Sequence, residues 1–295
     1  MTVTVETLEA LYRRGQYAAV VRELERLRED SPWEDALSAG KAYYYGAMAH
    51  YRLSQPAPAV ALITKALDEL HVSNDSPWIG RVRFQAGEVY RFAGHAGEAQ
   101  HWTELFLADM DAYQVHEPAR GKAHYNLGLI RRQQKDIPGS VAEYEQAETH
   151  LRDVGNTAWM VRAQENLCWV LVEAGQVVRA EAYLHKIEAA LATLGEDAPD
   201  LRELQLSFAC NRAFVLLHSG RAGAAVHFCQ EVVADDSGAT LAQRAFAAWI
   251  AAECALAMAD PEAARKLLAG AGRFAAESGD ARIMNYISAT RAKLT

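Results

Sequence analysis

The sequence predicts an all-α protein, a right-handed α-solenoid of about seven helical hairpins followed by a C-terminal capping helix. Two series of small residues support this prediction, because a fixed period is typical of stacked helical repeats and small side chains let paired helices approach closely. The first series recurs every 39 to 45 residues, at Gly46, Gly87, Gly128, Cys168, Ala213 and Ala252. The second follows each member by 12 or 13 residues, at Ala59, Ala99, Ser140, Ala180, Ala225 and Ala264. No run alternates apolar and polar residues between turns, as a strand would.

The expected elements follow in order along one continuous array over residues 1–295, since no linker is long enough to separate independent domains. The hairpins span approximately residues 5–30, 33–71, 77–113, 118–153, 157–195, 200–235 and 239–277, with the capping helix at 281–294. The first hairpin is shorter and more charged than the others, which is typical of a terminal repeat.

Helix starts and turns punctuate these hairpins. The segments 30–34 and 75–78 are nearly identical, and in each we expect a serine cap followed by proline at the first helical position. Glu34 is expected to complete a capping box. Within the hairpins, turn residues suited to ending one helix and starting the next occur at Gly94, Lys135-Asp136, Gly175, Gly220 and Asp260-Pro261.

The pattern of these residues resembles the tetratricopeptide repeat (TPR). It is clearest in Leu127-Gly128, in Gly87 with Tyr90, in Gly94 and in Glu98-Ala99, and it extends from about residue 5 to about residue 277. The period exceeds the usual 34 residues by about six, as in the lengthened repeats of Gram-positive intracellular receptors for signalling peptides. The resemblance implies a helical-repeat protein that binds a peptide or protein partner in a concave groove, in signalling such as quorum sensing.

Composition excludes several other classes of protein. The net charge of −8 and pI near 5.7 argue against general nucleic-acid binding. With no signal peptide and no membrane span, we expect a cytoplasmic protein without a membrane partner. The absence of catalytic, phosphate-binding and metal-ligand motifs predicts no enzyme activity, no cofactor and no metal site. Whether the chain forms a homodimer is left open by the sequence. The four cysteines are expected to be buried apolar residues: Cys168, Cys210, Cys229 and Cys254.

A polar column is the main clue to function. When the small residue of each first helix is numbered position 8, positions 2, 5, 6 and 9 share one helix face. Position 6 carries an amide in four successive repeats, at Gln85, Asn126, Asn166 and Asn211, and position 2 carries a basic residue in three, at Arg81, Lys122 and Arg162. The resemblance implies that this face lines the groove. Aromatic residues that would supply pockets there are Tyr43, Phe84, Tyr125, Trp169, Phe214 and Trp249.

Two interpretations of the amides stay open. Asparagine is a poor helix former, so three in the same helical position need a reason. They could bond neighbouring helices or preceding carbonyls, as structural groups. Alternatively, each amide offers donors and an acceptor to a peptide backbone, and the adjacent basic residues favour an acidic side chain or a C-terminal carboxylate.

The leading hypothesis from the sequence is therefore an intracellular receptor for a short extended peptide. Its candidate site comprises the four amides, the three basic residues, Tyr125 and Trp169. The alternatives are a scaffold that docks a folded protein partner, and a regulatory subunit or enzyme of a signalling system.

Overall fold

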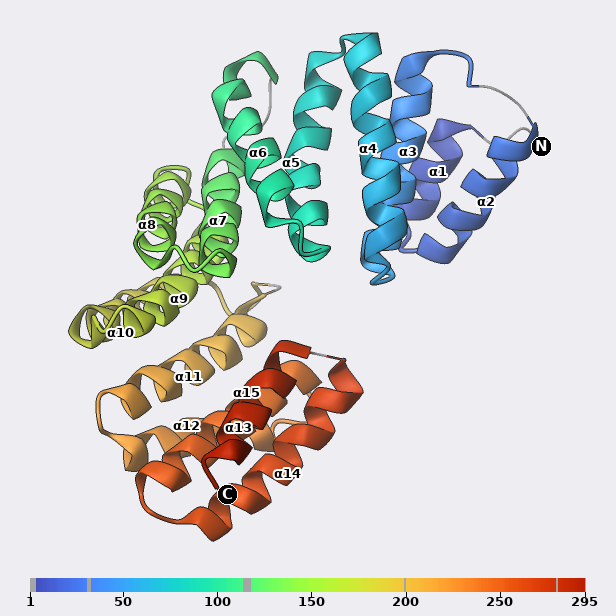
Figure 1. The fold of residues 1–295 in the computed structure, drawn as a ribbon. Coiled ribbons are helices and arrows are strands. Elements are labelled where there is room, and N and C mark those ends of the chain that lie inside the picture. Colours follow the sequence, from blue (N-terminus) through green and yellow to red (C-terminus); the bar gives the residue numbers. More distant parts are fainter. Residues whose placement is uncertain (1–3, 31–32, 114–117, 199, 280, 295) are drawn as a thin grey trace. The chain divides into compact units, whose positions relative to one another are not determined.

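The protein is built from α-helices joined by short turns (Figure 1). The computed structural model describes residues 4–30, 33–113, 118–198, 200–279 and 281–294, and contains no strand in these ranges. The all-α prediction is therefore confirmed. The helices follow one another in the order of the seven predicted hairpins: α1 (Val5–Arg13) and α2 (Tyr17–Asp30), α3 (Ala36–Arg52) and α4 (Pro56–Ser73), α5 (Ser76–Phe92) and α6 (Ala96–Ala108), α7 (Pro118–Gln133) and α8 (Ile137–Asp153), α9 (Thr157–Glu173) and α10 (Val177–Leu191), α11 (Leu201–His218) and α12 (Ala222–Ala234), and α13 (Leu241–Ala257) and α14 (Pro261–Ser278), followed by α15 (Ala281–Ala292). A short 3₁₀ helix, η1 (Met110–Tyr113), follows α6.

The two series of small residues lie where the helices of a hairpin meet. All twelve members are buried. A Cβ placed on Gly46 would lie 3.1 Å from Leu62 Cδ1 of its own hairpin and 2.3 Å from Leu24 Cδ2 of the preceding one, and a Cβ on Gly87 would lie 2.2 Å from Thr103 Oγ1. In a later hairpin, Cys168 Sγ lies 3.6 Å from the carbonyl oxygen of Ala180, so the two series touch directly. Larger side chains at these positions would force the helices apart.

Each hairpin turn ends its first helix with one left-handed residue. The backbone φ is positive at Gly15, Ser54, Gly94, Lys135, Gly175, Gly220 and Ala259. The next residue donates its N–H to a carbonyl five residues back, as from Gln176 to Leu171 at 2.7 Å. This is the Schellman arrangement. Four turns use glycine, whereas Ser54, Lys135 and Ala259 adopt the same conformation with a Cβ, which costs about 1–2 kcal/mol each.

The expected helix caps are displaced in the structure. Asp35 caps α3, since its Oδ1 accepts the Ser38 N–H at 2.7 Å, and Glu34 lies outside the helix and forms no capping box. The serine expected to cap this helix, Ser31, lies outside the described residues. At α5, Asp75 caps the helix by accepting the Trp78 N–H at 3.1 Å, so Ser76 is the first helical residue. A carboxylate suits this position because it also meets the positive end of the helix dipole.

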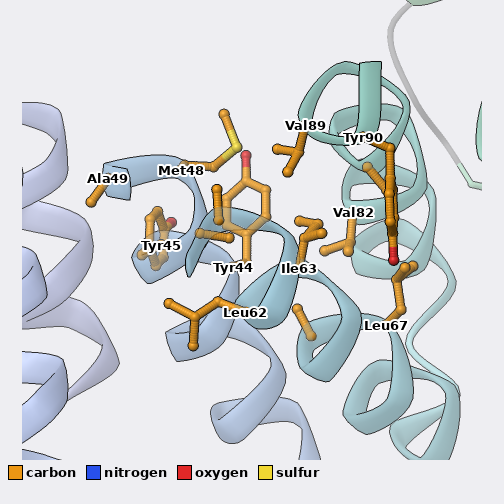
Figure 2. Packing of buried hydrophobic residues seen from close by; sticks show 14 of the residues in the cluster. Tyr44, Tyr45, Met48, Ala49, Leu62, Ile63, Leu67, Val82, Val89 and Tyr90 are labelled. Atoms are coloured by element: carbon orange, nitrogen blue, oxygen red, sulfur yellow. The ribbon is translucent and has the colours of Figure 1, made fainter. Parts of the chain in front are cut away.

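The chain forms two compact units, unit 1 (Met1–Asp136) and unit 2 (Ile137–Thr295). The expectation of one continuous array over residues 1–295 stays a prediction. In unit 1, the core runs through α1 to α7 and centres on aromatic and aliphatic side chains of α3, α4 and α5 (Figure 2). Figure 2 shows Tyr44 of α3 pointing among residues of these helices, and Thr64 Oγ1 lies 2.8 Å from the Tyr90 hydroxyl.

The first helices of the hairpins pack differently in the two units. In unit 2, α9 packs on α11, α11 on α13 and α13 on α15. In unit 1, α3, α5 and α7 touch one another at only a few positions, and the second helices α4 and α6 supply most of the contacts between hairpins. The faces of α3, α5 and α7 are therefore more separated than those of α9, α11 and α13, although α1 packs on α3.

Candidate functional site

The column face, defined as positions 2, 5, 6 and 9 of the first helices, brings together residues from successive hairpins. In unit 1, the position-6 amide of α7 bonds the position-9 carboxylate of α5: Asn126 Nδ2 donates to Glu88 Oε1 at 3.4 Å. Asn126 is only 2% exposed. Lys122, at position 2 of α7, is half-buried beside the same carboxylate. Burial lowers the pKa of Lys122, and Glu88 opposes that shift. Tyr125 is half-buried on the same helix.

Gln85 occupies position 6 of α5 and differs from Asn126. Its side chain is half-buried, and its Oε1 is shielded from solvent yet accepts no hydrogen bond from the described residues. Buried polar atoms in folded proteins nearly always have a partner. The amide oxygen of Gln85 is thus an unsatisfied acceptor on the column face.

Arg81, at position 2 of α5, lies on an aromatic ring. Its guanidinium carbon is 4.7 Å from the centre of the Trp78 ring, and the Lys41 Nζ of α3 is 5.2 Å from the same centre. Trp78 packs edge-on against Tyr44 and Tyr45, with ring centres 5.5 and 6.0 Å apart. Burial raises the pKa of Tyr44 well above its ordinary range, and the Arg81 charge opposes that shift.

In unit 2, the position-6 amides bond their own helices. Asn166 Nδ2 donates to the Arg162 carbonyl at 2.9 Å, and Asn211 Nδ2 donates to the Ser207 carbonyl at 3.2 Å. Both side chains are half-buried. Bonds of this type to the carbonyl four residues back are a structural use of asparagine.

A buried carboxyl group lies next to these amides. Glu165, at position 5 of α9, is 5% exposed, and its Oε2 accepts from Ser207 Oγ at 2.9 Å. Its Oε1 has no hydrogen-bond partner among the described residues. Burial raises the pKa of Glu165 to about 8, although the Ser207 bond and the Arg162 charge favour ionisation.

Arg162 is neutralised by a different carboxylate. Its Nη1 lies 3.0 Å from Glu203 Oε1 of α11. Burial by itself lowers the pKa of Arg162, but the bond to Glu203 and the negative charges of Glu203, Glu165 and Asp200 together more than offset this, and the pKa is raised. The basic residue at position 2 of α9 is therefore held in an ion pair within unit 2.

Aromatic rings fill the rest of the column face in unit 2. Trp169 stacks on Phe214 with ring centres 3.8 Å apart and planes 4° apart. Phe246, Trp249 and Tyr286 complete this aromatic cluster, and Tyr286 of α15 stacks on Trp249 at 4.9 Å. The cluster thus joins three first helices and the last helix, α15. Its rings are secured by hydrogen bonds from Trp169 Nε1 to Glu173 at 2.9 Å and from Trp249 Nε1 to Thr290 at 2.8 Å.

Sequence reasoning predicted the column face but did not select three residues that take part in its contacts. Phe214 and Trp249, considered as pocket-forming rings, are buried in the aromatic cluster at 4% and 8% exposure, because they pack on neighbouring rings of the same protein. The missed residues are Lys41, Trp78 and Glu88. Trp78 had a sequence signal, since the segment 75–78 repeats residues 30–33. Glu88 had a sequence signal too, because it occupies position 9 of its helix, which belongs to the column face.

The described residues show no centre for metal chemistry. They contain no group of three or more His, Cys, Asp or Glu side chains able to hold a metal ion. All four cysteines are free and buried, as predicted, and burial raises the pKa of Cys210 to about 12. In these same ranges, none of the helices combines the length and apolar character needed to cross a bilayer.

Comparison with known proteins identifies the fold. No protein-family model and no curated protein matches the sequence. Among solved structures, the apo form of RapI matches with a TM-score of 0.69 at 11% identity, over 90% of this chain and 94% of that one. NprR in complex with its cognate peptide NprX matches with a TM-score of 0.64 at 12% identity, over 98% and 81% of the two chains.

TPR-like repeats of a kinesin light chain from Podosopora anserina match with a TM-score of 0.51 at 19% identity, over 68% of this chain and 95% of that one. The protein therefore has the fold of an α-solenoid of TPR-like repeats, and the predicted fold is confirmed. At these identities the likeness extends to the fold, while function depends on the residues of the site.

Proposed function

We propose that this chain is a module that binds a short extended peptide on its column face, and that it serves as an intracellular signalling receptor rather than an enzyme. Gln85 carries the proposal. Its buried amide oxygen accepts no hydrogen bond from the described residues, and an unsatisfied buried acceptor costs about 1–3 kcal/mol. A peptide N–H group would supply the missing donor.

The arrangement of unit 1 supports this proposal. Because α3, α5 and α7 touch at only a few positions, their column faces are not closed by mutual packing. A side-chain amide can accept from a peptide N–H and donate to its C=O, so amides one repeat apart match the repeating groups of an extended chain. NprR, whose fold is similar, has been solved with a peptide bound.

Docking of a folded protein is the alternative function, and one feature of unit 1 favours it. A cavity of about 220 Å³ lies outside the column face, between α4, α5 and α6. Apolar residues and charged residues both line it, including Leu67, Ile79 and Trp102. Val72, at the end of α4, is 75% exposed. Such a surface suits one anchoring side chain of a protein partner.

A peptide-library screen with the full chain tests the proposal. For a peptide that binds, Gln85→Ala should raise the dissociation constant about 5- to 150-fold, which corresponds to one lost hydrogen bond of about 1–3 kcal/mol. Gln100→Ala is the matched control, because the half-buried Gln100 amide accepts from Gln134 Nε2 at 2.9 Å and lies outside the column face.

Equal effects of the two substitutions would contradict the assignment of Gln85. If no peptide in the library binds, and Asn126→Ala and Asn166→Ala both strongly lower stability, the amides are structural. Protein docking then becomes the better explanation of the fold.

A further inference from the structure

The basic residues of the column face differ in whether a carboxylate neutralises them. Lys122 lies beside Glu88, and Arg162 forms an ion pair with Glu203 at 3.0 Å. Arg81 has no ion-pair partner among the described residues, and the same holds for Lys41. Two of the positive charges in unit 1 are therefore held without a counter-ion from the protein.

These two cations lie on one platform. Each is within 5.2 Å of the centre of the Trp78 ring, although Lys41 comes from α3 and Arg81 from α5. Trp78 is itself fixed by its edge-on packing against Tyr44 and Tyr45. Contacts between a cation and an aromatic face contribute about 0.5–1 kcal/mol at exposed sites, so the ring holds both side chains near each other.

Nearby carboxylates leave the pair unneutralised. Asp75 is engaged in capping α5, where its Oδ1 accepts the Trp78 N–H at 3.1 Å. Glu6 and Asp35 are exposed, and each has a pKa lowered chiefly by local hydrogen bonds and only slightly by Lys41. Neither approaches Lys41 closely enough to form an ion pair. Solvent screens such separated charges.

From this geometry we infer that Lys41, Trp78 and Arg81 form a subsite for a carboxylate of the peptide, an inference that rests on the proposed function. Positive charges held against one ring repel each other, and a bound anion reduces that repulsion. The guanidinium of Arg81 offers paired N–H donors that match a carboxylate, and Lys41 adds a second charge. The whole chain has a net charge of −8, whereas this subsite is positively charged. An anion is therefore expected to bind at this subsite and not elsewhere on the surface.

A titration with small carboxylates tests the subsite without a known peptide. The indole N–H signals of the ¹⁵N-labelled full chain are recorded by NMR, and the Trp78 signal is assigned with Trp78→Phe. N-acetylglycine represents a C-terminal carboxylate, and the α-amide of N-acetylglutamate represents an acidic side chain. The α-amide of N-acetylglutamine and sodium chloride at matched ionic strength are the controls.

We expect a saturable shift of the Trp78 signal with the carboxylates and none with the controls. The variant with both Lys41→Gln and Arg81→Gln should lose this response. Arg212→Gln should retain it, because Arg212 lies 4.6 Å from the Phe228 ring and is already paired with Glu188. The more effective of the two carboxylates identifies which end or side chain of the peptide the subsite accepts.

The inference is overturned if the carboxylates leave the Trp78 signal unchanged, if chloride or the glutamine derivative shifts it equally, or if the double variant responds as the wild type does. These outcomes differ from a failure of the proposed function. A positive titration with no peptide binder in the library would reject the receptor and keep the anion subsite, whereas a peptide binder with a negative titration would reject the subsite alone.

Discussion

Unit 1 and unit 2 are built from the same hairpin, but their column faces have different chemistry. In unit 2, Trp169 and Phe214 stack and the neighbouring first helices pack on one another. In unit 1, the equivalent faces are more separated, Arg81 is unpaired among the described residues, and Gln85 has an unsatisfied oxygen. The comparison teaches that one helical register can pack aromatic rings together in one unit and leave polar groups without partners among the described residues in the other.

The aromatic cluster gives the largest expected difference. Trp169→Ala removes a buried ring that stacks on Phe214, and should lower the free energy of unfolding by about 3–5 kcal/mol. Trp78→Ala removes a half-buried ring in unit 1 and should cost only about 1–2 kcal/mol. Urea denaturation followed by circular dichroism measures both. Equal losses would contradict the view that rings hold the column face of unit 2 together.

Glu165 predicts a pH dependence that belongs to unit 2. Its folded-state pKa of about 8 lies above the ordinary value of 4.5. Between these values the unfolded chain has released the proton and the folded chain retains it. This group therefore lowers stability as pH rises from 4.5 to 8, by up to about 1.4 kcal/mol per pH unit.

Glu165→Gln should remove this slope and raise the melting temperature at neutral pH, because a neutral amide replaces a carboxyl group that resists ionisation. Ser207→Ala is the matched variant. It deletes the 2.9 Å bond that favours the ionised form, so the slope should extend to higher pH. Thermal denaturation across this pH range measures the melting temperatures of both variants and the wild type. Identical pH dependence for wild type and Glu165→Gln would show that the carboxyl group is hydrated in solution.

The position-6 asparagines of the two units should differ in their contribution to stability, and the expected difference is smaller than for the aromatic rings. Asn126 is buried and donates to Glu88, so Asn126→Ala should lower stability by about 1–3 kcal/mol by leaving Glu88 without that donor. Asn211 only bonds the carbonyl of Ser207 on its own helix. Because alanine is the better helix former, Asn211→Ala should change stability by no more than a few tenths of a kcal/mol, in the stabilising direction.

Chemical denaturation of both variants measures this difference. A strong loss in Asn211→Ala would mean that the amide of unit 2 has a structural role beyond its own helix. A neutral Asn126→Ala would mean that the Glu88 bond contributes little, and would leave the Asn126 amide available to a ligand.

The fold could be predicted from the sequence because its determinants are local and periodic. Gly87 must be small since Thr103 lies against it, and that requirement recurs in each hairpin at the same spacing. In the structure, residues on the column face also meet across hairpins, as Glu88 and Asn126 do.

The partner of each polar residue could not be predicted in the same way. Arg81 and Arg162 occupy the same position, but Arg162 reaches Glu203 while Arg81 lies on Trp78. Which contact forms depends on how closely neighbouring first helices pack. That distance is set by rings contributed from several repeats, such as Trp169 and Tyr286. Helical periodicity carries no information about it.

The hairpin turns give the smallest expected effects, and they test what the two units share. Lys135 in unit 1 adopts φ 64° and Gly175 in unit 2 adopts φ 70° at the same point of the turn. Lys135→Gly relieves the strain of a Cβ in the left-handed region but gives the unfolded chain more freedom, so the net gain in stability should be about 0.5–1 kcal/mol. Gly175→Ala should lose about 1 kcal/mol or more, since the new Cβ meets no neighbouring atom within 4 Å and only the backbone strain remains. Melting temperatures of the two variants should therefore move in opposite directions. If Lys135→Gly is instead destabilising, the lysine side chain contributes contacts that outweigh its backbone strain, and the turns of the two units are not equivalent.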